Sequence, residues 1–328
     1  MESKKLIKVS AVHAAPVYLD KNKTTKKIID FINKASRENS KIVVFPETYL
    51  PGFPIWNALD TPINNHEFFV QYQKNSVEIS GNEIKNIAEA AKKNHIIVSL
   101  GFSEKVNYSS GCLFNSNILI DENGEIKVHH RKMVPTFFEK LTWSNGDSKG
   151  LEVFDSPIGK IGALICGENT NPLARYSFIA QGEQIHISSY PPIWPTHTPN
   201  STDRYDLASA IRIRAGAHSF EGKLFNIVSS SIVDAETKSI LNKSINNAET
   251  IIQNSPKGLS MIVGPDGLPI KEISSENDQI LSAEIDLTKT IVAKQFHDLS
   301  GYYNRFDIFD LKVNRFRTKP INFNNEKN

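Results

Sequence analysis

The sequence contains only two cysteines, Cys112 and Cys166, among its 328 residues. Neither belongs to a CxxC pair or lies at a zinc-ligand spacing from a histidine, which excludes a disulfide framework and a structural zinc module. We therefore expect two reduced thiols, as in a cytoplasmic protein. Each cysteine is then either a small buried side chain or a reactive group, and its surroundings have to distinguish the two.

Long apolar runs and an excess of one charge are also missing. No run approaches the ~18 apolar residues of a membrane span. Lys8 and His13 interrupt the first apolar stretch, which is too short and too polar for a signal peptide. The formal net charge of +2 is too small to indicate nucleic-acid or membrane-surface binding. We expect no membrane and no nucleic-acid partner.

The chain has no linker rich in glycine, serine or proline, and no repeat with a period of roughly 20–50 residues. Its length is sufficient to bury a large core in one α/β domain. We expect a single domain over residues 1–310 and a C-terminal tail over residues 311–328, with residues 322–328 frayed.

Short apolar runs recur along the chain, separated by amphipathic or polar segments. We expect strands at 6–14, 41–47, 95–106, 158–166, 183–190 and 223–231, and hairpins over 115–132 and 259–273. Amphipathic helices are expected at 24–39 and 82–94, and excursions at 51–69 and 234–250. Alternating helices and strands combined with hairpins predict an α/β fold with large mixed sheets.

Three polar residues follow expected strands. Glu47 closes the run KIVVFPE, Lys132 closes VHHRK, and Cys166 closes IGALIC. The carboxyl ends of strands are where α/β sheets place their chemistry. Glu139 follows seven residues after Lys132 and offers a second carboxylate.

The chemistry is coherent if these groups converge. A lysine ammonium favours the reactive thiolate over the thiol, and a carboxylate can take the thiol proton and later return it. The ammonium also stabilises the anion formed when sulfur adds to an unsaturated carbon. Singly, each residue has an ordinary interpretation: Cys166 as a small core residue, and Glu47 and Lys132 as surface groups or a structural ion pair.

The local contexts settle the choice. FPETYLPGFP around Glu47, HRKMVPTFFE around Lys132 and LICGENTNPLARY around Cys166 resemble, in this order, the motifs of the nitrilase superfamily of carbon–nitrogen hydrolases. The resemblance implies a four-layer α-β-β-α sandwich and a homodimer or larger homo-oligomer. It implies Glu47 as general base, Lys132 as oxyanion stabiliser, Cys166 as nucleophile and Glu139 as the second glutamate. No cofactor and no metal are implied.

The residues after the cysteine resemble the true nitrilase branch. Gly167-Glu168-Asn169 and the segment 181–195 are similar to enzymes that convert a small-molecule nitrile to a carboxylic acid and ammonia. The route implied passes through a thioimidate and an acyl-thioester on Cys166, with Gly167 N–H as a candidate donor to the anion. The segment 301–309, GYYNRFDIF, departs from the usual pattern at Tyr302 and Phe306, which concerns assembly more than chemistry.

Other functions remain as alternatives. An amidase or N-carbamoyl hydrolase of the same superfamily would use the same triad, and a non-catalytic scaffold would retain only the fold. A cysteine–histidine dyad of Cys166 with His186 is a further alternative. His129-His130 lacks a third ligand by spacing and is expected to be a pair of strand-end polar residues.

Aromatic residues cluster near the motifs in the sequence and suit either a core or a substrate pocket. Phe53 belongs to this aromatic group but is not among the candidate substrate-binding residues. As candidate substrate-binding residues we take Tyr49, Trp56, Gly167, Tyr190 and Trp194.

Overall fold

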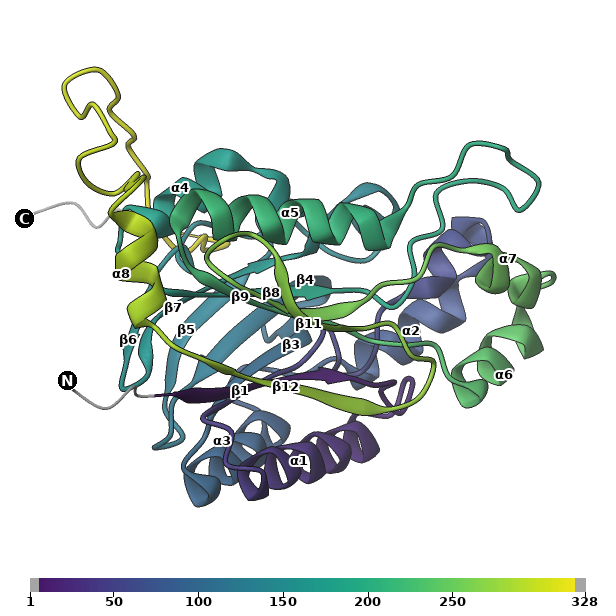
Figure 1. Ribbon diagram of the computed structural model, residues 1–328. Helices are drawn as coiled ribbons and strands as arrows, with labels where there is room; N and C mark the ends of the chain where they lie inside the picture. The colour runs from purple at the N-terminus through teal and green to yellow at the C-terminus, as the bar shows by residue number, and fades with distance from the viewer. Residues whose placement is uncertain (1–5, 322–328) are drawn as a thin grey trace, which may run out of the picture.

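The structure of the protein is a computed structural model that describes residues 6–321. Within this range the strands form two six-stranded sheets packed face to face, and helices cover the outer face of each sheet (Figure 1). The layers are helix, sheet, sheet and helix, so the predicted four-layer α-β-β-α sandwich is confirmed. The frayed end predicted for 322–328 lies outside the described residues.

The first sheet has the strand order β12-β1-β2-β3-β4-β5. Strands β1, β2 and β3 are parallel to one another, whereas β12, β4 and β5 pair antiparallel with their neighbours. Because β4 reverses the direction and β5 reverses it again, β5 runs the same way as β2. The strands are β1 (Ile7–His13), β2 (Ile42–Val44), β3 (Ile97–Val106), β4 (Ser109–Ile120), β5 (Ile126–Arg131) and β12 (Gln279–Ile285).

The second sheet has the order β11-β10-β9-β8-β7-β6, with parallel strands β7, β8 and β9 at its centre. Antiparallel partners flank them on both sides. The strands are β6 (Phe154–Ser156), β7 (Gly159–Ile165), β8 (Ile185–Tyr190), β9 (Phe225–Ser230), β10 (Ser260–Val263) and β11 (Pro269–Ile273).

Helices α1 (Lys21–Arg37) and α3 (Asn82–Asn94) cover the first sheet, and α4 (Pro172–Ile179) and α5 (Leu207–Gly222) cover the second (Figure 1). No helix within residues 6–321 is long and apolar enough to cross a membrane. The remaining helices are α2 (His66–Asn75), α6 (Ala235–Ser244), α7 (Ala248–Asn254) and α8 (Thr288–Lys294), and the 3-10 helices are η1 (Ile55–Ala58), η2 (Pro62–Asn64), η3 (Phe137–Leu141) and η4 (Cys166–Thr170).

The alternation of side chains along buried strands separates two apolar layers. In β2, Ile42 and Val44 face the other sheet, whereas Val43 faces the helices. Ile28 and Ile32, four residues apart on α1, pack into the helix-side layer beside Val43. The central strands read as continuous apolar runs because both of their faces are buried.

The structure differs from the sequence expectation in one strand boundary, in two strands and in two excursions. β2 ends at Val44, so Glu47 lies in a turn beyond the strand rather than at its last position. The edge strands β6 and β12 were not predicted, because partly exposed residues break their apolar pattern. The excursion at 51–69 contains η1, η2 and the start of α2, and the excursion at 234–250 contains α6 and the start of α7.

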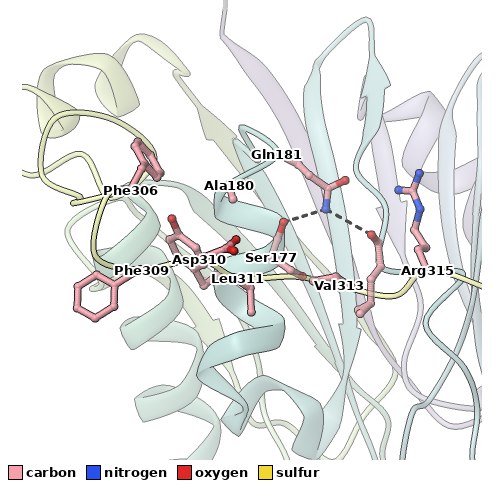
Figure 2. A pocket seen from close by; sticks show the side chains of 11 residues that line it. Ser177, Ala180, Gln181, Phe306, Phe309, Asp310, Leu311, Val313 and Arg315 are labelled. Carbon is pink, nitrogen blue, oxygen red and sulfur yellow. Dashed lines mark hydrogen bonds between the residues drawn. The ribbon is translucent and has the colours of Figure 1, made fainter.

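From residue 295 to residue 321 the chain contains no helix or strand, and part of this segment lies beside α4. A cavity of about 630 Å³ is lined by Phe306, Phe309 and Leu311 of this segment and by Ser177 and Gln181 (Figure 2). Farther on, Arg317 Nη1 lies 3.2 Å from Asp147 Oδ1. None of the predicted site residues lines this cavity. The domain boundary at residue 310 stays a prediction.

Candidate active site

The predicted chemical residues meet where three strands end. Lys132 directly follows β5, Cys166 directly follows β7, and Glu47 lies in the turn after β2. Because β2 and β5 run in the same direction, their carboxyl ends lie at one edge of the first sheet. The packed second sheet brings Cys166 to that edge. Glu47, Lys132 and Cys166 are at most 4% exposed.

Lys132 lies between two buried carboxylates. Its Nζ donates to Glu47 Oε1 at 2.7 Å, and to both oxygens of Glu139 at 2.6 and 2.9 Å. Glu139 Oε2 also accepts from the backbone N–H of Thr136 at 2.9 Å, which fixes it at the start of η3. The ammonium is thus held in one place by charge-assisted hydrogen bonds rather than free to move.

Glu47 has one oxygen engaged and one available. Oε1 accepts from Lys132 and from Asn115 Nδ2, the latter at 2.7 Å, while Oε2 is buried without a hydrogen-bond partner in the described chain. The turn carrying Glu47 passes very close to β3, since a Cβ on Gly101 would lie 2.2 Å from the carbonyl oxygen of Pro46. Glycine at 101 therefore permits the position of Glu47.

Sulfur and carboxylates are close together. Cys166 Sγ and one oxygen each of Glu47 and Glu139 all lie within 4.8 Å of one another. Cys166 has a φ of 48°, and residues with positive φ also occur in the other two loops, at Thr48 and Phe137. Such backbone costs about 1–3 kcal/mol per residue and clusters at functional sites.

The electrostatics of the group correct one expectation. Burial and then the Glu47 carboxylate raise the pKa of the Cys166 thiol well above its ordinary value, and together they outweigh the opposing effect of Lys132. The residue is therefore a thiol at rest, and not the thiolate expected from a neighbouring lysine. Burial raises the pKa of Glu139 to about 7, against the lowering effect of Lys132. Against the cost of burial, Glu139 and Glu47 raise the pKa of Lys132, which stays charged.

Glu168, two residues after the cysteine, ties the cysteine loop to the lysine loop. Its Oε2 accepts from the Ile165 N–H at 2.9 Å and lies 2.8 Å from His130 Nε2, while Oε1 accepts from the Met133 N–H at 2.7 Å. Although burial opposes it, His130 and the two N–H donors lower the pKa of Glu168. The sequence did not predict that Asn115 binds Glu47 or that Glu168 joins the two loops, although Glu168 lies within the cysteine motif.

The candidate pocket residues separate into two groups. Trp56, Tyr190 and Trp194 belong to the same buried cluster as Cys166. Trp194 packs on Phe138 at 4.6 Å between ring centres. Tyr49 lies in the cluster beneath α1 and α3 instead, and its hydroxyl donates to a backbone carbonyl there.

Gly167 is half-buried and packs against the lysine loop. A Cβ at this position would lie 2.9 Å from Thr136 Oγ1. A cavity of about 420 Å³ borders Gly167 and Thr136, and none of the aromatic residues Trp56, Tyr190 and Trp194 lines it.

The histidines of the alternative interpretations have other partners. His129 Nε2 lies 2.9 Å from Glu104 Oε2, and His130 is bound to Glu168, so the two rings lie apart rather than forming a pair of ligands. Both nitrogens of His186 are engaged, by Glu183 at 2.7 Å and by Asn169 at 3.0 Å. His186 therefore has no free nitrogen with which to form a dyad with Cys166.

Two groups of potential metal ligands occur among the described residues: Glu47, Glu139 and Cys166, and Glu183, His186 and His218. In the first group the Lys132 ammonium already occupies the place of a cation between the carboxylates. In the second group the nitrogens of His186 are hydrogen-bonded. The absence of a metal stays a prediction.

Solved structures share the fold. A Saccharomyces cerevisiae member of branch 10 of the nitrilase superfamily superposes with a TM-score of 0.68, at 21% identity over 90% of this chain and 96% of that chain. The Caenorhabditis elegans NitFhit protein superposes with a TM-score of 0.71, at 16% identity over 96% of this chain and 69% of that chain.

Sequence relatives cover almost the whole chain. A Penicillium rubens nitrilase is 34% identical over 98% of this chain and 97% of that protein. A Hypocrea virens arylacetonitrilase is 32% identical over 97% and 94%, and a Rhodococcus rhodochrous aliphatic nitrilase is 31% identical over 96% and 84%. The carbon-nitrogen hydrolase family model matches residues 8–295. The chain therefore belongs to the carbon–nitrogen hydrolase family, as its three motifs predicted, and is an enzyme that acts on carbon–nitrogen bonds.

Proposed function

We propose that this protein is a nitrilase, which converts a small organic nitrile and two waters to a carboxylic acid and ammonia. The observation that carries the proposal is the buried group of one thiol, two carboxylates and the ammonium held between them. Relatives named nitrilases, at 31–34% identity over nearly the full chain, support the choice of the nitrile as substrate.

The first step needs a base because the thiol is not ionised at rest. Glu47 Oε2, buried and without a partner, accepts the proton of Cys166 as sulfur attacks the nitrile carbon. The S–C bond forms, one C–N π bond breaks, and the nitrogen takes up a proton to give the thioimidate. Lys132 and the Gly167 N–H stabilise the negative charge that develops during the addition.

Water then converts the thioimidate to product in two stages. It adds to the same carbon, the nitrogen leaves as ammonia, and an acyl-thioester remains on Cys166. A second water releases the carboxylic acid and restores the thiol. Glu139, whose pKa of about 7 leaves it partly protonated near neutral pH, serves as the proton store for the departing nitrogen.

Trp56, Tyr190 and Trp194 are proposed to border the substrate side chain, because they share the buried cluster of Cys166. Tyr49 is left out, since its hydroxyl and ring are used in the layer beneath the helices. No cofactor and no metal enter the proposal.

We propose a cytoplasmic homo-oligomer, a dimer or larger. Large apolar side chains are exposed on the second sheet's helices and in the C-terminal segment, among them Leu173, Ile213, Phe220, Phe306 and Phe309. A surface of this kind is typical of an interface between copies. Light scattering coupled to size-exclusion chromatography tests it, and a monomer at micromolar concentration would contradict it.

The test of function is a panel of aliphatic, aryl and arylaceto nitriles, with the matching amides, assayed for released ammonia. Nitrile turnover is expected in the wild type. Activity on amides alone would favour the amidase or N-carbamoyl hydrolase alternative, and a protein inert to every substrate and to a thiol-directed probe would favour a scaffold.

Cys166→Ala should lower turnover more than about 100-fold while the fold stays intact, because the nucleophile is removed with little change in volume. Cys112→Ala is the matched control and should retain wild-type turnover, because Cys112 lies on β4 outside the site. A Cys166→Ala protein with more than about a hundredth of the wild-type rate would contradict covalent catalysis.

A further inference from the structure

The proposed reaction does not use a buried hydrogen-bond network that contacts the cysteine loop. The network consists of the side chains of Asn169, His186 and Glu183. Asn169 Nδ2 donates to the carbonyl oxygens of Cys166 at 3.1 Å and Leu164 at 3.3 Å. Asn169 Oδ1 lies 3.0 Å from His186 Nε2, and His186 Nδ1 lies 2.7 Å from Glu183 Oε1. All these side chains are at most 1% exposed, so each hydrogen bond is expensive to lose.

The backbone carbonyl groups determine which atom donates in each hydrogen bond of this network. Carbonyl oxygens can only accept, so the amide nitrogen of Asn169 must face Cys166 and Leu164, and its oxygen must face His186. His186 Nε2 therefore carries a hydrogen. Ser188 Oγ donates to the same amide oxygen at 3.0 Å, which holds the side chain from a second direction.

One proton is then shared between His186 Nδ1 and Glu183 Oε1. Burial lowers the pKa of His186 to about 3 and raises the pKa of Glu183, so both effects favour a neutral pair with the proton on Glu183. Glu183 Oε2 lies 3.0 Å from His218 Nε2. The donors thus point in one direction, from Glu183 through His186 and Asn169 to the Cys166 carbonyl.

The Cys166 carbonyl matters because of what lies at the other end of its peptide. In a trans peptide the C=O of one residue and the N–H of the next point in opposite directions, and the Cys166–Gly167 peptide is trans. Cys166 has a strained φ of 48°, and Gly167 adds no Cβ to restrict its own rotation. This peptide lies in the first turn of the short 3-10 helix η4, and the Asn169 amide adds a side-chain hydrogen bond to its carbonyl oxygen.

We propose that Asn169, oriented by His186, is a positioning residue that locks the Cys166–Gly167 peptide so that the Gly167 N–H is aimed at the substrate anion. Holding the carbonyl on the Asn169 side turns the N–H to the opposite side, toward the reacting carbon. The inference rests on the proposed function, because it concerns the anion formed after Cys166 attacks. It adds a step-specific role for residues outside the Glu–Lys–Cys group.

The test compares Asn169→Leu, His186→Phe and His186→Gln, all in a Cys112→Ala background. Leucine and phenylalanine remove the hydrogen bonds, whereas the amide of glutamine reaches about as far as histidine Nε2 and can still donate to Asn169. Two rates are measured: kcat on an accepted nitrile, and alkylation of Cys166 by iodoacetamide. Alkylation replaces iodide at a saturated carbon and forms no anion for Gly167 to stabilise.

Loss of one such donor costs about 10²–10³ in kcat, so we expect kcat to fall roughly 10- to 1,000-fold in Asn169→Leu and His186→Phe. KM and the alkylation rate should stay within a few-fold of the background, and His186→Gln should recover most of the lost kcat. Unchanged kcat would overturn the inference. So would a parallel fall in kcat and alkylation, because that result indicates a general structural role.

Two controls decide how these rates are interpreted: the folding of Asn169→Leu and the activity of Cys166→Ala. If Asn169→Leu shows no cooperative thermal unfolding, the two His186 variants decide, and equal kcat values for them overturn the inference. Cys166→Ala is assayed first: turnover by this variant would refute the proposed function itself, whereas normal Cys166 dependence with unchanged Asn169→Leu kcat refutes only the positioning role.

Discussion

At the residue scale, the chemistry depends on the shape of one cation. Lys132 places a compact ammonium within 2.9 Å of three carboxylate oxygens in a site closed to solvent. Lys132→Arg retains the charge, but the guanidinium is longer and planar and does not fit between Glu47 and Glu139. We expect turnover close to zero, with no covalent adduct detected by mass spectrometry after incubation with substrate. Normal turnover would mean that Lys132 is only a structural ion.

A second residue, Glu139, determines whether the carboxylic acid or the amide is released. After water adds to the thioimidate, the same carbon carries sulfur and nitrogen, and ammonia departs only if the nitrogen is protonated. Glu139 can supply that proton, whereas glutamine cannot. Glu139→Gln should lower the rate by roughly 10²-fold or more and raise the share of amide over acid. Chromatography of the products gives the ratio. Amide as the main product of the wild type would contradict the nitrilase assignment.

At the element scale, the placement of Glu47 depends on how closely a turn approaches a strand. A Cβ added at Gly101 on β3 would meet the Pro46 carbonyl oxygen at 2.2 Å and the Thr48 nitrogen at 2.7 Å, and both are backbone atoms. Gly101→Ala should therefore displace the turn, destabilise the fold by about 1–3 kcal/mol and strongly reduce turnover. Denaturant unfolding and the nitrile assay measure the two effects.

Gly111, on the neighbouring strand β4, is the matched control for that experiment. A Cβ there meets nothing within 4 Å, so Gly111→Ala should leave turnover unchanged. Equal behaviour of the two variants would show that the close approach at Gly101 does not hold Glu47 in place.

At the scale of the whole molecule, the buried carboxylate should affect the pH dependence of stability. Burial raises the pKa of Glu139 from 4.5 to about 7, so folding favours its protonated form. This contribution is fully present below pH 4.5 and is lost as the pH rises through about 7. The Tm of the wild type should therefore fall more between pH 5 and pH 8 than the Tm of Glu139→Gln. Parallel Tm curves measured by calorimetry would contradict the raised pKa.

Much of this protein could be read from its sequence because the information is local. Strand-length apolar runs and the 3.6-residue spacing of α1 and α3 predicted the elements of an α/β fold, since burial on one or both faces leaves a direct pattern. Three short motifs singled out Glu47, Lys132, Glu139 and Cys166, because the chemistry requires those residue types. The edge strands β6 and β12 escaped prediction, since partial exposure removes the apolar pattern on which such predictions depend.

The tertiary structure alone decided how these residues act on one another. Burial by the two packed sheets, and the nearby Glu47, keep Cys166 as a thiol despite the lysine beside it, because desolvation outweighs one favourable charge. The same packing separated Tyr49 from the cluster of Trp56, Tyr190 and Trp194. It also joined Asn169 to His186, which are distant in sequence. Sequence determines residue types and periodicity, whereas distances and solvent exclusion arise only when distant segments pack together.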